Sequence, residues 1–574
     1  MTPEFALGDE LSQAVAARLA ALTAERFVAR LWARDPSLWS DETPHRAVIA
    51  NRLGWLDAPV SMEGQIARLA AFAAEVAREG FTHAVLLGMG GSSLAPEVLR
   101  LSLGVRPGAI DLTVLDDTSP AAVRAVAEAH DPARTLFVVS SKSGSTIEVI
   151  SFERYFFEWS RAHKGANTGR AFVAVTDPGT SLERLARSRG YRDVFHGAPD
   201  IGGRYSALSA FGLVPAALIG ADLEELIAGA RRELEPVRAG ASAGEVAGVR
   251  LGVALGEAAL RGRDKLTLVL DRDVASFGSW VEQLVAESTG KSGKGIVPVV
   301  EEPLGEPDAY GSDRVFVALG ASFAPGTEDA LRAIARAGHP LLRWEMSPAS
   351  LGAEFARWEV ATATAAAILG IDPFDEPNVT EAKQATQAVL EGLLVAGRFP
   401  DERAVAVARG LETYAPAAVS QALRAHVGAG AEPPAWMRAL LALARPGDYA
   451  ALLAYLPRTT ERHQRLQRLR HAIGATSRLA TTLGYGPRYL HSTGQLHKGG
   501  PDRGLFLEFT ADEGKDLEIP GERFSFGALH RAQAAGDYAA LERRGRRLVR
   551  IHLGADADAG LDLLIEAVAA ARRL

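Results

Sequence analysis

The chain has 574 residues, of which 47% are hydrophobic, and this apolar content is enough for several large cores. At about 100–200 residues per domain, we expect two to four domains. The formal net charge of -7 gives no basic field, so neither nucleic acid nor an anionic membrane is an expected partner. The absence of cysteine excludes disulfides, thiolate metal sites and cysteine nucleophiles, and it suits a reducing compartment.

The sequence shows neither a secretion signal nor a membrane span. The first residues lack a basic segment, and the acidic Asp9 and Glu10 follow at once. The longest weakly charged apolar run, residues 360–371, is too short to cross a bilayer, which needs about 20 residues. We therefore expect a soluble, cytoplasmic protein.

The first part of the chain is predicted to be helical and the next part to alternate between strand and helix. Residues 1–60 are a helical lead-in, because apolar side chains recur at helical spacing from residue 11 on. From residue 61 on, short runs of Val, Leu and Phe alternate with helical patterns, which is typical of a parallel sheet covered on both faces. A doubly wound α/β domain is expected over residues 61–220. Its predicted strands are 82–87, 111–115, 135–140 and 171–176.

The same alternation recurs after a charged helical bridge, residues 221–244. It predicts a second doubly wound α/β domain over residues 245–385, with strands at 266–270, 296–300 and 314–319. The remaining region, 386–574, is rich in Ala, Arg and Leu and is predicted to be mostly helical, with strands at 504–510 and 548–553. Ligands of open parallel sheets bind beyond the carboxyl ends of the strands, so motifs at these ends are candidates for a site.

The first predicted strand ends in a glycine-rich loop, residues 88–93, with the sequence GMGGSS. Glycine lets a backbone approach a ligand closely, and the helix that follows offers free N–H groups. A dinucleotide site would need a third glycine where this chain has Ser93, although Asp116 and Asp117 lie at a suitable distance. A tight turn without a ligand is the other interpretation.

The third predicted strand leads into a loop rich in hydroxyl groups, residues 140–146, with the sequence SSKSGST. A helix is predicted to begin near Ile147, and the backbone N–H groups of its first turn, together with the hydroxyls, can surround a phosphate. The order of a Walker loop is absent, so a nucleoside triphosphate is not expected. Helix N-cap residues without a ligand are the alternative.

Later segments place charged residues beside glycines. Arg204, in the sequence IGGRYS, could meet an oxyanion, although an arginine in a surface loop would look the same. Glu287 ends a predicted helix before a loop rich in Gly and Lys, where an isolated carboxylate is usually exposed to solvent. Further on, the segment DPFDEPNV is followed by Lys383, and His491 opens the segment HSTGQLHK.

Together these segments resemble the glucose-6-phosphate isomerase family, which is built from two sugar-isomerase (SIS) domains. The match covers roughly residues 80–385 and a short segment near 491. The resemblance implies an α/β fold with two doubly wound parallel-sheet SIS domains, a helical N-terminal lead-in and a mostly helical C-terminal region. It also implies interconversion of glucose 6-phosphate and fructose 6-phosphate, a small sugar-phosphate substrate, no cofactor and a homodimer.

The resemblance also assigns roles to individual residues. Glu287 corresponds to the base, Arg204 to the group that stabilises the enediol, and Lys383 and His491 to the groups that open the sugar ring. The substrate-binding positions are Gly91, Ser92, Ser141, Lys142, Ser143, Ser145, Thr146, Gly203 and Glu376. This chemistry needs a carboxylate, a fixed cation and an imidazole but no metal, and the sequence has no H-x-x-x-H or clustered ligand set for one.

Two features depart from the family pattern. Glu376 stands where the family usually has Gln, and the segment at His491 follows Lys383, whereas most family members have it before that lysine. The late segment resembles the isomerase half of bifunctional transaldolase/glucose-6-phosphate isomerase proteins. Only about 60 residues precede the first α/β domain here, and a transaldolase barrel needs about 250, so the isomerase half alone is expected.

Other functions remain open at this stage. A non-catalytic SIS protein that senses a sugar phosphate would keep the hydroxyl groups of residues 141–146 but lose the base, the arginine and the lysine. A dual phosphoglucose/phosphomannose isomerase would use the same base and differ only in details of the pocket. An amidotransferase-linked amino-sugar synthase is disfavoured because its glutamine-hydrolysing half needs a cysteine nucleophile.

Overall fold

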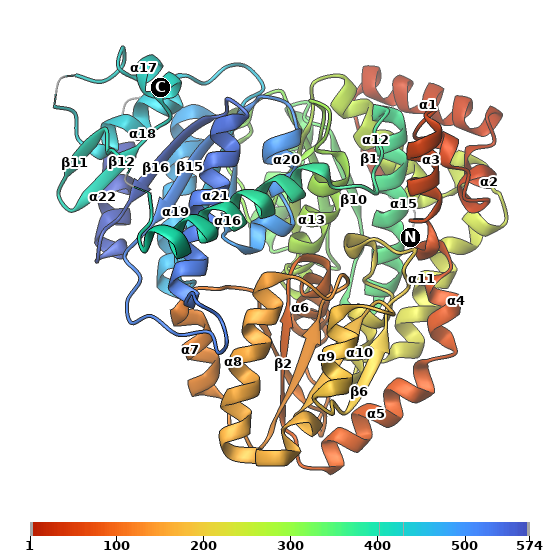
Figure 1. The fold of residues 1–574 in the computed structure, drawn as a ribbon. Helices are drawn as coiled ribbons and strands as arrows, with labels where there is room; N and C mark the ends of the chain where they lie inside the picture. The colour runs from red at the N-terminus through yellow and green to blue at the C-terminus, as the bar shows by residue number, and fades with distance from the viewer. Residues whose placement is uncertain (1–3, 401, 429, 571–574) are drawn as a thin grey trace.

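The computed structural model describes residues 4–400, 402–428 and 430–570, and it contains three β-sheets that are each covered by helices (Figure 1). The unit with the first sheet lies at the bottom of Figure 1, and the units with the second and third sheets lie side by side above it. No helix in these three ranges is long and apolar enough to cross a membrane.

The first sheet has five parallel strands in the order β3-β2-β4-β5-β6. They are β2 (His83–Gly88), β3 (Asp111–Leu115), β4 (Thr135–Ser140), β5 (Phe172–Thr176) and β6 (Asp193–His196). All six residues of β4 are buried, as expected for a strand with helices on both faces. The structure confirms the four predicted strands and adds β6, a short edge strand with too few apolar residues to be recognised.

The two loops that carry the glycines and the hydroxyl groups start next to each other. β2 and β4 are neighbours in the sheet, and their last residues, Gly88 and Ser140, are partners in the register. The helix α8 (Ile147–Lys164) begins at the residue where its start is predicted. The first sheet therefore brings both loops to one edge, at the carboxyl ends of its central strands.

The second sheet has the order β1-β10-β9-β7-β8. Its strands are β1 (Glu4–Ala6), β7 (Lys265–Leu270), β8 (Val297–Val299), β9 (Arg314–Leu319) and β10 (Leu341–Trp344). β1 is antiparallel to β10, so the helical lead-in contributes an edge strand that its three residues are too few to predict. Three of the parallel strands match the prediction, and β10 adds a fourth.

Long helices link the first two sheets and position the base. The predicted bridge contains α11 (Leu223–Arg238), and α13 (Phe277–Thr289) follows β7. The apolar run at residues 360–371 belongs mostly to α15 (Leu351–Leu369), which packs tightly on α12 (Ala247–Leu260). The helices approach closely at Gly252, where an added Cβ would lie 2.3 Å from the carbonyl oxygen of Ala361. This apolar run is therefore part of a buried helix pair.

The prediction for the C-terminal region missed a third sheet of six strands, in the order β11-β12-β16-β15-β13-β14. They are β11 (Ala406–Ala408), β12 (Leu411–Tyr414), β13 (Tyr449–Tyr455), β14 (Ala480–Tyr485), β15 (Gly504–Thr510) and β16 (Arg547–His552). Only β15 and β16 are predicted. The sequence of β13, YAALLAY, is buried at every residue, and a short apolar run of this kind fits a buried helix equally well.

Helices cover both faces of this third sheet. Alternate residues of β13 pack against α19 (Thr460–Ser477) and α22 (Ala557–Ala569) on one face. The remaining residues of β13 pack against α21 (Phe526–Arg543), which itself packs on α16 (Pro377–Ala396). The short helices η10 (Arg488–His491) and α20 (Gly494–Gly499) lie between β14 and β15 and carry the segment of His491. The C-terminal region is thus a third α/β unit.

Candidate active site

Glu287 is buried at the end of α13, with 7% of its surface exposed, and is not the solvent-exposed carboxylate that its sequence position alone would suggest. Its Oε1 lies 3.2 Å from Nη1 of Arg204, and its Oε2 accepts a hydrogen bond of 3.0 Å from Nε2 of Gln283. Burial raises the pKa of Glu287, and the nearby Arg204 offsets only part of this effect. A carboxylate with a raised pKa is suited to accept a proton and give it back.

Arg204, in the short helix η5 (Gly203–Tyr205), is held in place by hydrogen bonds from all three guanidinium nitrogens. Its Nε donates to Ser288 Oγ at 2.9 Å. Its Nη2 donates to the carbonyl oxygens of Pro373 and Asp375 at 2.6 and 2.9 Å. The planar charge is therefore fixed beside Glu287, as stabilisation of a developing oxyanion requires.

Glu376 lies next to the base. Its Oε2 is 3.0 Å from Arg204 Nη1, the same nitrogen that contacts Glu287. Two carboxylates therefore share one guanidinium nitrogen, and the charge of Glu376 contributes to the raised pKa of Glu287. The half-exposed Glu376 side chain reaches the site from the residue just before α16.

Lys291 was missed in the sequence analysis, although it lies in the Gly- and Lys-rich loop that follows Glu287. Its buried Nζ donates to the carbonyl oxygen of Asp372 at 2.6 Å and pairs with Asp375 Oδ1 at 2.6 Å. Burial lowers the pKa of Lys291 to about 8. Lys291 thus holds the loop that presents Glu376 to Arg204.

The glycine-rich loop joins three segments of the chain. A Cβ at Gly91 would lie 2.0 Å from the carbonyl oxygen of Gly203, and one at Gly90 would lie 2.8 Å from that of His491. Gly90 has a φ of +54°, which also favours glycine. Ser92 is buried in the same short helix, η3 (Gly90–Ser92). The glycines allow the backbones that carry Arg204 and His491 to pack against this loop.

The backbone carbonyl of His491 and the carboxylate of Glu287 share one hydrogen-bond donor within the same chain. Nε2 of Gln283 donates to the His491 carbonyl oxygen at 2.8 Å and to Glu287 Oε2 at 3.0 Å. The amide of Gln283, another residue that the sequence analysis missed, therefore links the base to the segment of His491. The altered order of these segments along the sequence does not keep them apart in space.

Glu148 is the partner of the His491 imidazole, and the sequence analysis missed it. Its Oε1 lies 3.0 Å from His491 Nε2 and accepts a hydrogen bond of 2.8 Å from Gln533 Nε2. Burial would raise the pKa of Glu148, but the charge and hydrogen bond of His491 outweigh it, so the pKa is lowered. The sequence signal for Glu148 was its position as a carboxylate in the first turn of the helix that follows the hydroxyl-rich loop.

Residues 141–146, which we call the hydroxyl loop, form a compact turn. Some of its hydroxyl groups form hydrogen bonds within the loop. Ser141 Oγ lies 3.0 Å from Thr146 Oγ1 and accepts a hydrogen bond of 3.1 Å from the Gly144 backbone N–H. Ser143 and Ser145 have their hydroxyl oxygens 3.2 Å apart, and both side chains line a cavity. These two side chains are thus open to a ligand.

This cavity of about 460 Å³, which we call the active-site cavity, lies between the hydroxyl loop and α16, and its described lining residues do not include Glu287 or Arg204. Its wall includes the exposed Lys383. The structure thus gathers several predicted residues and two others around one space. They are Ser143, Ser145, Thr146, Lys383 and His491, with Glu148 and Gln533.

Lys142, which is predicted to be a substrate contact, has partners within the protein. Its Nζ pairs with Asp177 and donates to the carbonyl oxygen of Ala198 at 3.2 Å. The side chain thus ties the hydroxyl loop to the loop after β5. The single lysine of the hydroxyl loop therefore supports the fold of that loop.

Comparison with known proteins identifies the family. A family model described as phosphoglucose isomerase matches residues 69–301. The glucose-6-phosphate isomerase of Citrifermentans bemidjiense is 29% identical over 422 residues, which cover 64% of this chain and 75% of that enzyme. A crystal structure of a protein of Thermus thermophilus, described as hypothetical, has a TM-score of 0.55 at 23% identity. The matched region covers 68% of this chain and 99% of the Thermus thermophilus protein, and the match supports the fold.

The glucose-6-phosphate isomerase of Rubrobacter xylanophilus gives the strongest support for assigning this chain to a family. It is 30% identical over 367 residues, and the match covers 55% of this chain and 84% of that enzyme. The finer resemblance to the isomerase half of transaldolase fusions stays a prediction. The chain belongs to the glucose-6-phosphate isomerase family.

Proposed function

We propose that this protein interconverts glucose 6-phosphate and fructose 6-phosphate through a cis-enediol intermediate. The observation that carries the proposal is the buried Glu287 carboxylate, held between Arg204 and Gln283. Gln283 also bonds the backbone of His491, whose imidazole pairs with Glu148. This arrangement joins a base, an oxyanion-stabilising cation and a second acid–base group. Aldose–ketose isomerisation uses these three groups.

In this mechanism the phosphate anchors the sugar and performs no chemistry. Hydroxyl groups and backbone N–H groups at the start of α8 bind it, so that the energy of this contact positions C1 and C2. The His491 imidazole, oriented by Glu148, transfers a proton during ring opening, and Lys383 in the cavity wall assists. Glu287 then moves a proton between C2 and C1 while Arg204 stabilises the enediolate.

An assay of the purified protein tests the function directly. We expect fructose 6-phosphate to be converted into glucose 6-phosphate, with glucose 6-phosphate and mannose 6-phosphate scored separately by coupled enzymes. Formation of both products would identify a dual isomerase, since the same base serves both epimers. Binding of the sugar phosphate without turnover would contradict the proposal and favour a sensor.

The hydroxyl loop is expected to act through the phosphate. Replacing Ser143 and Thr146 together by Ala removes two hydrogen bonds to a charged group, at about 1.5–3 kcal/mol each, and should raise the KM for fructose 6-phosphate about 100-fold or more. Inorganic phosphate should lose inhibitory potency in parallel. Slow turnover of non-phosphorylated fructose should hardly change. Equal losses on both sugars would indicate a folding defect and contradict the assignment.

Glu376 is expected to shift the pH dependence of the reaction. Glu376→Gln removes a negative charge that raises the pKa of Glu287, so the pKa of the base should fall. Because the base must be ionised, the acidic limb of kcat/KM should move to lower pH, by roughly 0.5–1 unit for a half-exposed group. Arg204, Gln283 and Lys291 stay in place around the base.

The matched control for this variant is Glu381→Gln. Glu381 is also in the first turns of α16, but it pairs with Arg544 and Asn378. Its pH profile should coincide with that of the wild type. A shift of the Glu376→Gln profile to higher pH, or none, would contradict the coupling of the two carboxylates.

A homodimer, a cytoplasmic location and the lack of a nucleic-acid partner are proposed with this function. The support is the family and the acidic net charge. We also propose that residues 61–220 and 245–385 are the two SIS domains, each with its own parallel sheet. Light scattering of the purified protein tests the dimer through its mass, and the single-chain mass would contradict it.

A further inference from the structure

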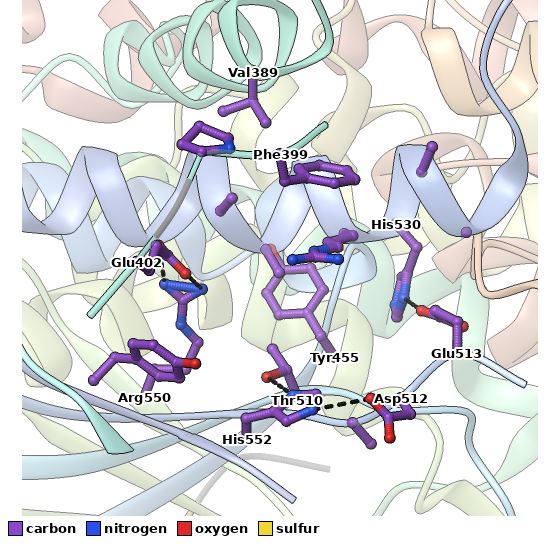
Figure 2. Close-up of a pocket in the computed structure, with 18 of the residues that line it drawn as sticks. Val389, Phe399, Glu402, Tyr455, Thr510, Asp512, Glu513, His530, Arg550 and His552 are labelled. Carbon is purple, nitrogen blue, oxygen red and sulfur yellow. Dashed lines mark hydrogen bonds and ion pairs between the residues drawn. The ribbon is translucent and has the colours of Figure 1, made fainter. Parts of the chain in front are cut away.

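A second cavity, of about 900 Å³, lies in the C-terminal unit and is separate from the active-site cavity (Figure 2). Tyr455, Thr510 and His552, the last residues of the parallel strands β13, β15 and β16, all line it. Among the described residues, the two cavities have no lining residue in common. Its volume suits a small organic molecule.

The topology of the third sheet places this cavity where doubly wound sheets bind ligands. The chain leaves β13 through α19 to reach β14 on one side, and it leaves β15 through α21 to reach β16 on the other. The direction of the sheet therefore reverses between β13 and β15. A crevice opens beyond the carboxyl ends of the strands at such a switch point.

The two walls of the second cavity differ in character, as Figure 2 shows. The helix side carries the apolar residues Val389, Leu393 and Phe399 and small residues of α21 such as Ala535, and α21 also contributes His530 and Arg531. The guanidinium of Arg531 stacks over the Phe399 ring at 4.3 Å. The sheet side is polar. A ligand that fits must present a flat or apolar part to the helices and hydrogen-bonding groups to the sheet.

The charges of the second cavity disfavour a phosphate. Five carboxylates line it, against two guanidinium groups, Arg531 and Arg550, and Arg550 already pairs with Glu402. The start of α21 is also occupied, because Asp516 Oδ1 accepts the Gly527 N–H at 2.8 Å. A phosphate would compete with that carboxylate for the donors that it normally uses. The cavity therefore suits a ligand without a negative charge.

We propose that the second cavity is an effector site for a nucleoside without a phosphate group. The base would lie between the two walls, where Phe399 of the helix side and Tyr455 of the sheet side offer rings for stacking. The ribose hydroxyls would donate to the carboxylate of Asp512, the second residue after β15. The Oδ1 of Asp512 lies 3.2 Å from His552 Nε2. A carboxylate after a strand binds ribose hydroxyls in the same way in dinucleotide sites.

A short chain of contacts joins this site to the catalytic groups. The Tyr455 hydroxyl, in the cavity wall, donates to the backbone oxygen of Gln533 at 3.3 Å. The side chain of Gln533 donates to Glu148 Oε1 at 2.8 Å, the atom that also contacts His491 Nε2. A ligand that shifts α21 therefore changes the position of the pair that opens the sugar ring.

The helix α16 forms a second connection. Lys383 on this helix lines the active-site cavity, and Leu393, further along it, lines the second cavity. α16 and α21 touch at Gly536, where an added Cβ would lie 2.7 Å from the backbone nitrogen of Thr386. The two helices are thus packed tightly against each other between the two sites.

Calorimetry with adenosine and adenosine 5′-monophosphate on the full chain tests the site without reference to activity. Adenosine should bind, and the monophosphate should bind at least about 10-fold more weakly. Ala535→Trp, which fills the cavity, should abolish binding. Failure of adenosine to bind, equal or tighter binding of the monophosphate, or full binding by Ala535→Trp would overturn the proposal.

Two aspartates that flank β15 provide a matched pair of variants. Asp512, after the strand, pairs with His552 at 3.2 Å, and Asp502, before it, pairs with Arg546 at 3.3 Å. Both side chains are more than half exposed. Asp512→Asn should weaken adenosine binding about 10-fold, whereas Asp502→Asn should leave it unchanged. Equal effects of both variants would overturn the site.

The effect on catalysis rests on the proposed isomerase function and is measured separately. Saturating adenosine should change kcat/KM for fructose 6-phosphate about 5-fold in the wild type and leave Ala535→Trp unaffected. Binding without any change in kcat/KM would overturn the effector role. An inactive protein that still binds adenosine would instead contradict the proposed isomerase function.

Discussion

Replacing Glu287 by Gln is expected to lower kcat for fructose 6-phosphate by about 10²–10⁴-fold, because the amide cannot accept a proton. The side chain keeps its shape and an oxygen that faces Arg204, so the binding of an unreactive analogue such as sorbitol 6-phosphate should change little. Steady-state kinetics and calorimetry measure the two quantities.

Glu282 provides the control for this variant, because it is a second glutamate on α13 with a perturbed carboxyl group. Burial raises the pKa of Glu282 to about 8, so the group is largely neutral at pH 7 and Gln is a close substitute. Glu282→Gln should keep nearly full activity. If Glu287→Gln kept more than about a tenth of the wild-type turnover, Glu287 would not be the base.

The second large effect is expected for His491→Ala. Without the imidazole, Glu148 loses its partner for proton transfer, and turnover of the cyclic sugar should fall about 100-fold or more. Exchange of the C1 or C2 proton with solvent, measured by NMR on an open-chain sugar phosphate, should fall much less, since it needs Glu287 and Arg204 but not the imidazole.

His196→Ala is a suitable control, because His196 is also paired with a glutamate. Its Nε2 lies 3.2 Å from Glu183 Oε1 at the far edge of the first sheet. This variant should leave both reactions intact. Parallel losses of both reactions in His491→Ala, or none, would show that His491 has no specific part in ring opening.

Strands could be predicted where a short apolar run is followed by a clearly helical pattern. Strands whose own sequence also suits a helix could not be predicted. β3, β4 and β9 have the predicted bounds, because each apolar run is followed by a polar turn and a helical pattern. β13 has alanine and leucine, which suit a helix, and becomes a strand through its neighbours in the sheet. The third sheet was therefore missed.

Local motifs of the site could be predicted, but contacts between distant segments could not. The base and the hydroxyl loop carry their own sequence signals, with a helix end or start and characteristic residues. The pairing of Glu148 with His491 joins residues that are 343 positions apart, so the position of Glu148 in the first turn of α8 does not identify its partner. The same holds for Lys142, whose ion pair with Asp177 depends on the order of strands in the first sheet.

The distance along the chain between Glu148 and its partners has a consequence for the newly made protein. At roughly 5–20 residues per second, His491 leaves the ribosome about 17–70 s after Glu148, and Gln533 follows later. During this interval the buried carboxylate lacks both groups that hydrogen-bond to it. The ring-opening half of the site thus forms only at the end of translation, and a chain halted before residue 491 could at most process sugars that are already open.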